Sequence, residues 1–345
     1  MQSESESESE SAPHGIVNIN NSCYLNSCIQ ILCQIEPLIH IIETVKPQNQ
    51  NIIEMKLFQN MKDISTIMKT NKTNSLLYPN GMVSAIEEVS KHKKLSFFQH
   101  QEQEDISEFL LFVIESLHEC YSREIQILIS GHSENETDNL AIEVYKKTKD
   151  VCEKQYSEIV SLFRGVQVSK IESFDAGTKY TQNVEIYYIL DLPVLDKNTT
   201  IYECLDDYVQ YEILDGTNKW LNPTTNSFEK VRKSLVFWSF PEIFVICLKR
   251  YRNDGTIHDS IVEYPLELDL RKYCVGYNKV ECMYELMGIS THEGNMTNGH
   301  YSAFVKKGQQ WFYCNDEIVK SVDNKNYLVT KCAYCLFYVK KNKSV

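Results

Sequence analysis

The stretch "NINNSCYLNSCIQIL", residues 18–32, places asparagines and a cysteine directly before an apolar helical pattern. Ser22 or Asn21 is a suitable helix cap, which puts Cys23 in the first turn of the expected helix. Unpaired backbone N–H groups and the helix dipole at that position favour a thiolate. A cysteine at such a boundary can equally be a small buried hydrophobic residue. The stretch predicts a helix over residues 23–35, ended by Pro37, and leaves the role of Cys23 open.

Composition limits the class of protein and its partners. The chain has 345 residues and is 43% hydrophobic, enough for one elaborate domain or two closely joined ones. No run of about eighteen apolar residues occurs, so we expect no membrane partner. The net charge of −12 argues against nucleic acid as the main partner and favours a basic one. Residues 1–14 begin with a Ser/Glu repeat that lacks the features of a signal peptide, which predicts a disordered acidic tail.

The cysteines point to a reducing compartment. Twelve cysteines in a chain of this length without a secretory signal favour free thiols and a cytoplasmic or nuclear location, in a host cell if the source is a virus. The one Cys-x-x-Cys pair, Cys332 and Cys335, lies in "KCAYCLFYVKK", which is typical of a buried strand. Because no second pair at ligand spacing accompanies it, we expect no structural zinc there.

The two halves of the chain differ in pattern. Residues 15–165 are mainly helical, and "QEDISEFLLFVIESLHE" (103–119) is a clear amphipathic helix. Its apolar positions are Ile106, Phe109, Leu110, Val113, Ile114 and Leu117. From about residue 166 onward strands and turns alternate without intervening helices, which indicates an antiparallel sheet. The expected fold class is α+β, with a helical N-terminal lobe, a β-rich C-terminal lobe and a site in the cleft between them.

The C-terminal half supplies a base for a thiol. In "GHYSAFVKKGQQWFYCND" (299–316), a two-residue turn at Lys307-Gly308 would set His300 opposite Asn315. The Asn carbonyl oxygen would accept the Nδ1–H bond and leave Nε2 facing the thiol. If the register slips by one residue, Asp316 takes the place of Asn315. With nine histidines and twelve cysteines, a plausible Cys/His pair can also arise by chance.

A nucleophile that attacks a carbonyl needs donors for the developing oxyanion. The Asn18 side-chain amide could supply them beside the backbone N–H at the helix start, and Asn20 and Asn21 are alternatives, one of which caps the helix. Asp105 and Glu108 lie three residues apart on one helix face with Glu104 beside them. This acidic rim suits a basic substrate, unless it is simply a solvated helix face.

At this point the sequence resembles a known family. "GIVNINNSCYLNSCIQIL" (15–32) is similar to the cysteine box of the ubiquitin-specific proteases, G-L-x-N-L-G-N-T-C-Y-M-N-S-x-L-Q-x-L, and "GHYSAFVKKGQQWFYCNDEIV" (299–319) resembles their histidine box. Five more segments match in the family's order: "QEDISEFLLFVIESLHE" (103–119), "FRGVQVS" (163–169), "CLKRY" (247–251), "YPLELDL" (264–270) and "AYCLFY" (333–338).

The resemblance implies a papain-like cysteine peptidase of thumb (about 15–165), fingers and palm (about 166–345) that cleaves isopeptide and peptide bonds after the C-terminal Gly of ubiquitin. Its partners would be ubiquitin and ubiquitinated proteins, it would need no cofactor or metal, and we expect a monomer. By position, the resemblance makes Cys23 the nucleophile, His300 the general base, Asn315 the orienting residue, Asn18 the oxyanion donor and Asp316 an assisting acid. The residues implied along the channel for the ubiquitin tail are Gln103, Asp105, Glu108, Tyr251, His292 and Tyr301.

Some positions depart from the family pattern. Asn20 stands where Gly is common, which suggests strain in the loop that positions Asn18, and Ser22 replaces Thr. Glu104 replaces a Gln, and Phe304 replaces a common Tyr. The segments 169–177 and 218–225 lack the zinc-binding cysteines of the fingers, so we expect the fingers to hold by packing. Two alternatives remain: a catalytically silent ubiquitin-binding scaffold, and a peptidase for another modifier that ends in Gly-Gly.

Overall fold

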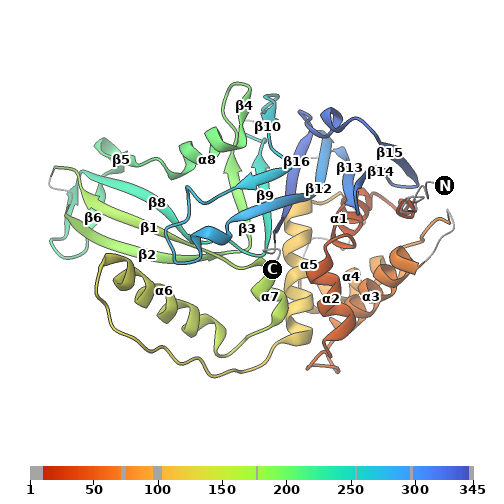
Figure 1. Cartoon of the computed structure of the whole chain (residues 1–345), viewed down its shortest axis with the longest axis horizontal. Coiled ribbons are helices and arrows are strands. Elements are labelled where there is room, and N and C mark those ends of the chain that lie inside the picture. The colour runs from red at the N-terminus through yellow and green to blue at the C-terminus, as the bar shows by residue number, and fades with distance from the viewer. Residues whose placement is uncertain are drawn as a thin grey trace, which may run out of the picture.

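The N-terminal half of the chain forms a helical lobe. The computed structural model describes residues 11–70, 75–95, 103–175, 178–252, 255–295 and 298–341. Helix α5 (Ile106–Tyr121) runs down the middle of the molecule in Figure 1, and all of the apolar residues predicted for its core-facing side are buried. The other helices of this lobe are α1 (Cys23–Leu32), α2 (Glu36–Thr44), α3 (Met55–Thr70), α4 (Asn80–Lys93), α6 (Glu136–Cys152) and α7 (Glu158–Phe163).

Helix α1 starts at Cys23, as predicted, but it ends earlier than predicted. It stops at Leu32, and Pro37 lies in the first turn of α2. Proline fits there because the first turn of a helix leaves its N–H groups without helical partners and needs the φ angle that proline fixes. Pro37 therefore begins a second helix.

The C-terminal half is dominated by an eight-stranded sheet. Its order is β15-β14-β13-β12-β16-β9-β3, and β11 pairs with β12 beside this path. The strands are β3 (Ile189–Pro193), β9 (Ile243–Lys249), β11 (Glu267–Asp269), β12 (Met283–Gly294), β13 (Gly299–Lys307), β14 (Gln310–Asn315), β15 (Ile318–Val322) and β16 (Ala333–Lys340). Within this sheet the predicted antiparallel pairing is correct except that β3 is parallel to β9. The long connection between these two strands, which includes helix α8 (Ile201–Val209), allows the parallel arrangement.

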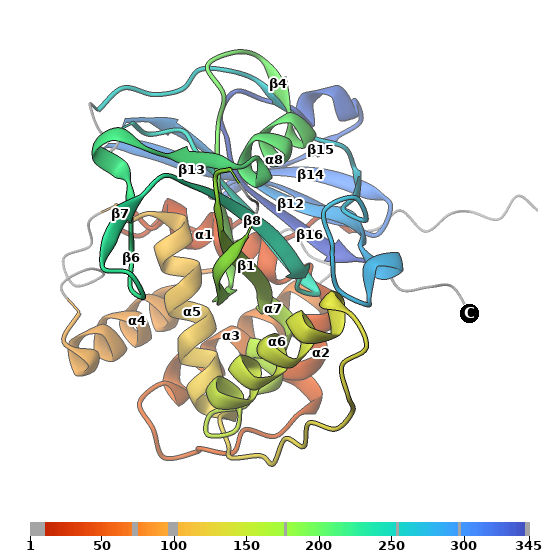
Figure 2. The same ribbon diagram turned by 90° about the vertical axis from the view of Figure 1, so that its left-hand side faces the viewer.

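A second, four-stranded sheet extends away from the first. Its order is β2-β1-β8-β5, from β1 (Gly165–Ser173), β2 (Lys179–Tyr187), β5 (Glu212–Leu214) and β8 (Val231–Ser239). Helix α6 packs on one face of it through Leu140, Ala141 and Val144, and Figure 2 shows this helix beneath the strands. Short pairs join β4 (Thr199–Thr200) to β10 (Val262–Glu263) and β6 (Trp220–Asn222) to β7 (Ser227–Glu229).

Helix α1 is fixed against the large sheet. The Ser27 hydroxyl bonds the Ser290 hydroxyl of β12 at 2.9 Å and donates to the Ser302 carbonyl of β13 at 3.0 Å. Gly288 lets the two elements approach, because a Cβ there would lie 2.4 Å from Ile31 Cγ2. This close packing places the start of α1 beside the start of β13, where the Tyr301 N–H contacts the Cys23 sulfur. Cys23 therefore lies near His300, the residue before Tyr301, although the two are far apart in the sequence.

The outer end of the four-stranded sheet is held by polar and aromatic contacts in the described residues. Asn222, Thr225 and Ser227 donate to one oxygen of the Glu229 carboxylate at 2.9, 2.8 and 3.2 Å. Trp220 stacks on Tyr180 with ring centroids 5.5 Å apart. Across the described ranges, no group of three or more His, Cys, Asp or Glu residues could hold a metal ion.

Residues 11–14 of the predicted tail are described by the structure. Residues 1–10 lie outside the described residues, so the predicted disorder of that part stays a prediction. His14 is buried, and its carbonyl accepts from Gln30 Nε2 at 2.6 Å. In the part of the chain that is described, no single helix is long and apolar enough to cross a membrane; α1 and α2 reach that length only together and are bent by 85°.

Candidate active site

Cys23 is the first residue of α1, and its side chain is buried with 3% exposure. The predicted capping bond from Ser22 is replaced by a different one, in which the Ser22 hydroxyl accepts from the Ile19 N–H at 2.8 Å. This bond folds the loop before the helix back on itself. The backbone N–H groups of the first helical turn are therefore left for the thiol and for an incoming oxyanion.

The electrostatics of Cys23 differ from the sequence-based expectation. Burial raises the pKa of the thiol above its ordinary value, and the negative charge of Asp316 raises it further. The backbone N–H groups of Tyr301, Tyr24 and Cys23 itself lower it, as expected at a helix start, but they do not outweigh burial. Cys23 is therefore a protonated thiol in this state and needs a base to become a nucleophile. The contact with Tyr301 also places the sulfur next to the residue that follows His300.

His300 and Asn315 meet as predicted, but through different geometry. Lys307 pairs with Gln310, so the turn is Gly308-Gln309 and the register is two residues away from the predicted one. Gly308, with φ +53°, fits the first turn position, where a left-handed conformation requires glycine. A shift of two residues keeps the same face of the sheet. His300 Nε2 consequently still lies 2.7 Å from Asn315 Oδ1, on a diagonal.

His300 bonds Asn315 through Nε2, whereas the prediction had Nδ1 in this bond. Because an amide oxygen only accepts, Nε2–H is the donor to Asn315. This bond fixes the tautomer and leaves Nδ1, which the prediction had assigned to Asn315, as the nitrogen that can take the Cys23 proton.

Asp316 positions Asn18. Its carboxylate accepts from Asn18 Nδ2 and from Asn26 Nδ2, each at 2.8 Å, and lies 3.9 Å from His300 Nε2. Asn18 Oδ1 accepts the Ser22 N–H at 3.0 Å, so the amide is held at both ends. The Asn18 nitrogen carries a second hydrogen, which is the one available to an oxyanion. The role of Asn26 was missed, although its position in the cysteine box was a possible signal.

The loop asparagines have conformational roles. Asn20 and Asn21 are exposed and take φ values of +48° and +67°, in the left-handed region. Asparagine is the residue that tolerates this region best after glycine. The strain expected from Asn20 is thus in its backbone, and of these three asparagines only Asn18 is half-buried.

A cavity of about 270 Å³ lies beside the thiol. All of the predicted channel residues line it, together with Glu104, Ser107 and Lys249; the predicted ones are Gln103, Asp105, Glu108, Tyr251, His292 and Tyr301. Gln103 links the cavity to the thiol, because its Oε1 accepts the Gly299 N–H at 2.7 Å and its Nε2 lies 3.9 Å from Cys23 Sγ. Lys249 was not predicted to line the cavity; it is the lysine of the "CLKRY" segment and lies 3.3 Å from Asp191.

Asp105 has a structural role as well as a charge. It is the N-cap of α5, outside the helix proper, and its Oδ1 accepts the Ser107 N–H at 2.7 Å. Its other oxygen accepts the Tyr334 hydroxyl, a partner that sequence reasoning did not identify. His292 bonds the Tyr251 hydroxyl through Nδ1, and burial lowers its pKa, so the cavity wall there is a neutral imidazole.

This α+β fold places a thiol at a helix start and a His–Asn pair on the adjoining sheet, an arrangement that cysteine peptidases use. The family described as "Ubiquitin carboxyl-terminal hydrolase" matches residues 14–338, and the chain belongs to it.

Individual members of this family are similar to the chain in sequence. "Ubiquitin carboxyl-terminal hydrolase 4" of Saccharomyces cerevisiae (strain RM11-1a) is 27% identical over 364 residues, which cover 94% of this chain and 39% of that protein. "Ubiquitin carboxyl-terminal hydrolase Usp2" of Drosophila melanogaster is 27% identical over 336 residues, covering 94% and 34%. The chain thus spans well under half the length of these relatives.

Among solved structures, the Ubp8/Sgf11/Sus1/Sgf73 module bound to monoubiquitin has a TM-score of 0.72 at 23% identity, covering 95% of this chain and 69% of that one. The same module bound to ubiquitin aldehyde gives 0.71. These likenesses confirm the predicted fold.

Proposed function

We propose that the chain is a deubiquitinating cysteine protease that cleaves isopeptide and peptide bonds after the C-terminal Gly of ubiquitin. The observation that carries the proposal is the Cys23 thiol at the start of α1, in contact with the Tyr301 N–H, and the preceding residue His300, whose Nε2 lies 2.7 Å from Asn315 Oδ1. His300 Nδ1 takes the thiol proton, and the thiolate attacks the carbonyl carbon of the terminal Gly. The Cys23 N–H and Asn18 Nδ2 stabilise the oxyanion. His300 then protonates the leaving amine, and water hydrolyses the thioester.

The cavity supports a basic tail as the part of the substrate that binds. Glu104, Asp105 and Glu108 give it three carboxylates against one lysine. The ubiquitin tail, which carries arginines before its Gly-Gly end, would place opposite charge along this wall. Ubiquitin and ubiquitinated proteins are the proposed partners. We also propose that the chain acts as a monomer in the cytoplasm or nucleus, without nucleic acid or a membrane.

The test of this proposal is turnover of fluorogenic substrates. Ubiquitin with a C-terminal fluorophore should be hydrolysed, whereas ubiquitin-like modifiers ending in Gly-Gly should be hydrolysed much more slowly. Equal or faster turnover of another modifier would replace the proposed substrate, and no turnover of any of them would contradict the peptidase proposal.

Asn315→Ala is expected to lower kcat/KM on the order of 10²-fold, at the low end of what acid–base catalysis contributes. The imidazole remains but loses the acceptor that fixes its tautomer and plane. Steady-state kinetics with ubiquitin-fluorophore measure this, and Asn315→Asp, which keeps the acceptor, is the control and should retain most activity. Wild-type rates in Asn315→Ala would remove Asn315 from the mechanism.

Two substitutions at Asp105 separate its charge from its structural role. Asp105→Asn keeps an N-cap of equal quality, and its amide N–H can donate to the Tyr334 hydroxyl in place of the present bond. The free energy of unfolding should therefore stay near that of the wild type, while KM for ubiquitin-fluorophore rises. Asp105→Ala should also raise KM and in addition lower the free energy of unfolding by about 1 kcal/mol. Urea unfolding and steady-state kinetics on both variants measure the two effects. An unchanged KM in Asp105→Asn would show that its charge does not contact the substrate.

A further inference from the structure

Cys274 and Cys282 form a thiol pair at a distance from the proposed active site. Cys274 follows β11, Cys282 directly precedes β12, and their thiols are hydrogen-bonded to each other. Cys274 Sγ also lies 3.3 Å from the Trp238 carbonyl oxygen, and Cys282 Sγ lies 3.6 Å from that of Asn278. Both cysteines are 2% exposed. The fold therefore brings the two free thiols into contact, which a disulfide between them requires.

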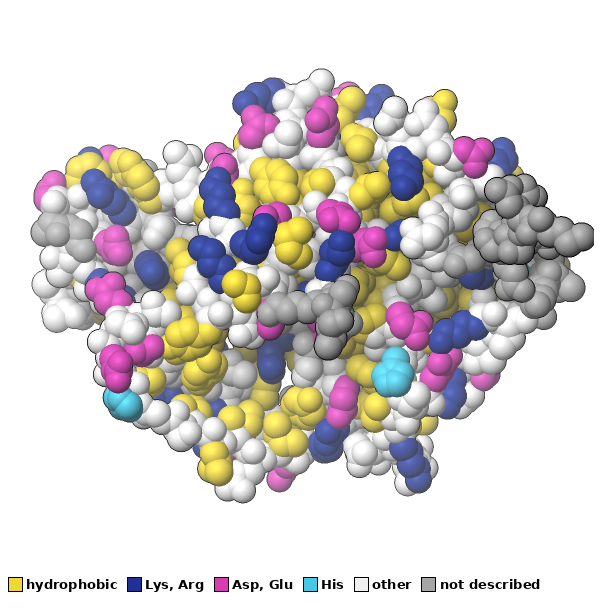
Figure 3. Space-filling view, viewed as in Figure 1, with side chains coloured by type: hydrophobic (Ala, Val, Ile, Leu, Met, Phe, Trp, Pro, Cys, Tyr) yellow, Lys and Arg dark blue, Asp and Glu magenta, His cyan; other side chains and the backbone are white. Residues whose placement is uncertain are grey.

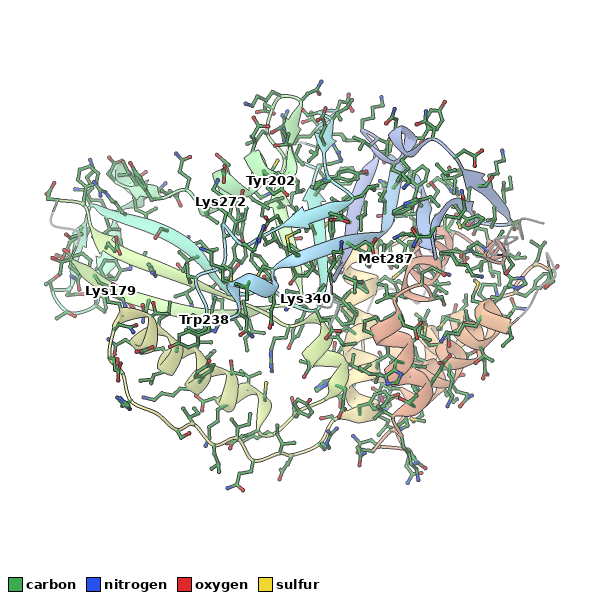
Figure 4. The ribbon with its side chains drawn as sticks, viewed as in Figure 1. Lys179, Tyr202, Trp238, Lys272, Met287 and Lys340 are labelled. Carbon is green, nitrogen blue, oxygen red and sulfur yellow. The ribbon has the colours of Figure 1, made fainter. Side chains whose placement is uncertain are left out.

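The surroundings of this pair favour a thiolate at Cys274. The hydrogen bond from Cys282 lowers the pKa of Cys274, and burial opposes it by raising the pKa. The Gly276 N–H and the ammonium groups of Lys340 and Lys279 lower the pKa further. Figure 4 shows Trp238 and Lys340 on the face where this segment lies, and in Figure 3 lysine and arginine side chains gather on the same face. A thiolate in a positively charged environment is the form of cysteine that peroxides oxidise.

The segment that joins the two cysteines, residues 275–281, lies at the surface. Tyr277 and Val280 are 54% and 66% exposed. Tyr277 packs edge-on against Trp238, with ring centroids 5.4 Å apart, and its hydroxyl donates to Asp138 of α6. A short segment with exposed side chains opens locally at small cost, so a small oxidant can reach the thiols behind it.

We propose that Cys274 and Cys282 are a redox modification site, in which hydrogen peroxide joins them in a disulfide that closes the segment 274–282. The Cys274 thiolate attacks one peroxide oxygen, giving a sulfenic acid and releasing hydroxide, which becomes water on protonation. The Cys282 thiol then attacks the Cys274 sulfur, the S–S bond forms and a second water leaves. Two thiols lose two electrons in all, and one peroxide is reduced to two waters. The site is additional to the proposed peptidase function and does not rest on it.

A second cysteine pair provides an internal comparison. Cys247 and Cys335 are register partners on β9 and β16 and are hydrogen-bonded to each other. Both are 0% exposed, within the core between the helical lobe and the large sheet. Burial raises the pKa of Cys335. The two thiols of this pair are thus in contact, but neither is held as a thiolate and a peroxide cannot reach them. We expect it to stay reduced.

Peptide mapping tests the proposal on the full chain. The protein is treated with hydrogen peroxide, its remaining thiols are blocked with N-ethylmaleimide, and it is digested with trypsin without reduction. Cleavage after Lys272, Lys279 and Lys306 puts Cys274 in peptide 273–279 and Cys282 in peptide 280–306. We expect these two peptides linked, separable by dithiothreitol, and at least about tenfold more abundant than linked peptides of Cys247 and Cys335, because reactivity follows thiolate fraction and access.

Two variants complete the design. Cys282→Ser should remove the linked peptide and leave a Cys274 sulfenic acid that dimedone labels, whereas Cys247→Ser should leave the 274–282 link unchanged. If Cys282→Ser does not fold by circular dichroism, the wild-type map decides alone. The proposal is overturned if both peptides carry N-ethylmaleimide after peroxide treatment, if Cys274 links to a different cysteine, or if the Cys247 and Cys335 peptides link to the same extent.

Discussion

Cys23→Ala is expected to reduce hydrolysis of ubiquitin-fluorophore by on the order of 10⁴-fold or more, as when a nucleophile that acts within a catalytic unit is removed. The substitution removes only the sulfur from a residue that is 3% exposed at a helix start. The cavity beside it is lined by other residues, so ubiquitin binding should persist. Hydrolysis rates and isothermal titration with ubiquitin measure the two effects, and a ubiquitin C-terminal electrophile should form an adduct with the wild type alone.

Cys28→Ala is the matched control for this experiment. Cys28 lies in the same helix and is 0% exposed, and burial raises its pKa strongly, so it cannot serve as a nucleophile. Its variant should keep wild-type turnover per folded molecule. Substantial turnover in Cys23→Ala would mean that another group performs the attack, and loss of ubiquitin binding would mean that Cys23 has a structural role.

The local features of the fold could be predicted where local chemistry decides them. The helix start at Cys23 and the buried side of α5 follow from asparagines before an apolar pattern and from helical spacing. The β13–β14 register could not be predicted from the sequence, because it depends on whether Gly308 takes the first or the second position of the turn. The sequence is compatible with either position. The predicted register was wrong by two residues, and an even shift keeps each side chain on the same face of the sheet, so His300 and Asn315 still meet.

Other features of the site depend on contacts between distant parts of the chain. Asp316 was predicted as a possible orienter of His300 and lies 3.9 Å from His300 Nε2. It also binds Asn18 and Asn26, which lie 298 and 290 residues away in sequence. No periodicity encodes such a contact. The same holds for the choice of Nε2 over Nδ1 at His300, which depends on how the His300 ring is oriented relative to the Asn315 amide. Family resemblance could name these residues, but the partner of each atom required the three-dimensional structure.

His300→Ala is expected to lower kcat/KM on the order of 10³- to 10⁴-fold, toward the upper end of what acid–base catalysis contributes. The reason lies in the raised pKa of the Cys23 thiol, which burial and the Asp316 charge keep protonated. Without the imidazole, the thiolate forms only by loss of a proton to water. The residual rate should therefore climb about tenfold per pH unit for as long as the pH lies below the pKa of the thiol.

The pH profile is the measurement that separates this role from a structural one. In the wild type the imidazole takes the thiol proton, so its profile should lack this steep alkaline rise, and Asn315→Ala, which keeps the imidazole, should follow a parallel profile at a lower rate. Only His300→Ala should continue to rise through the alkaline range, because only there does the thiol titrate by itself. Circular dichroism sets the pH range over which each variant stays folded. A His300→Ala profile parallel to that of the wild type would show that His300 is not the base, and would assign the proton of Cys23 to another acceptor.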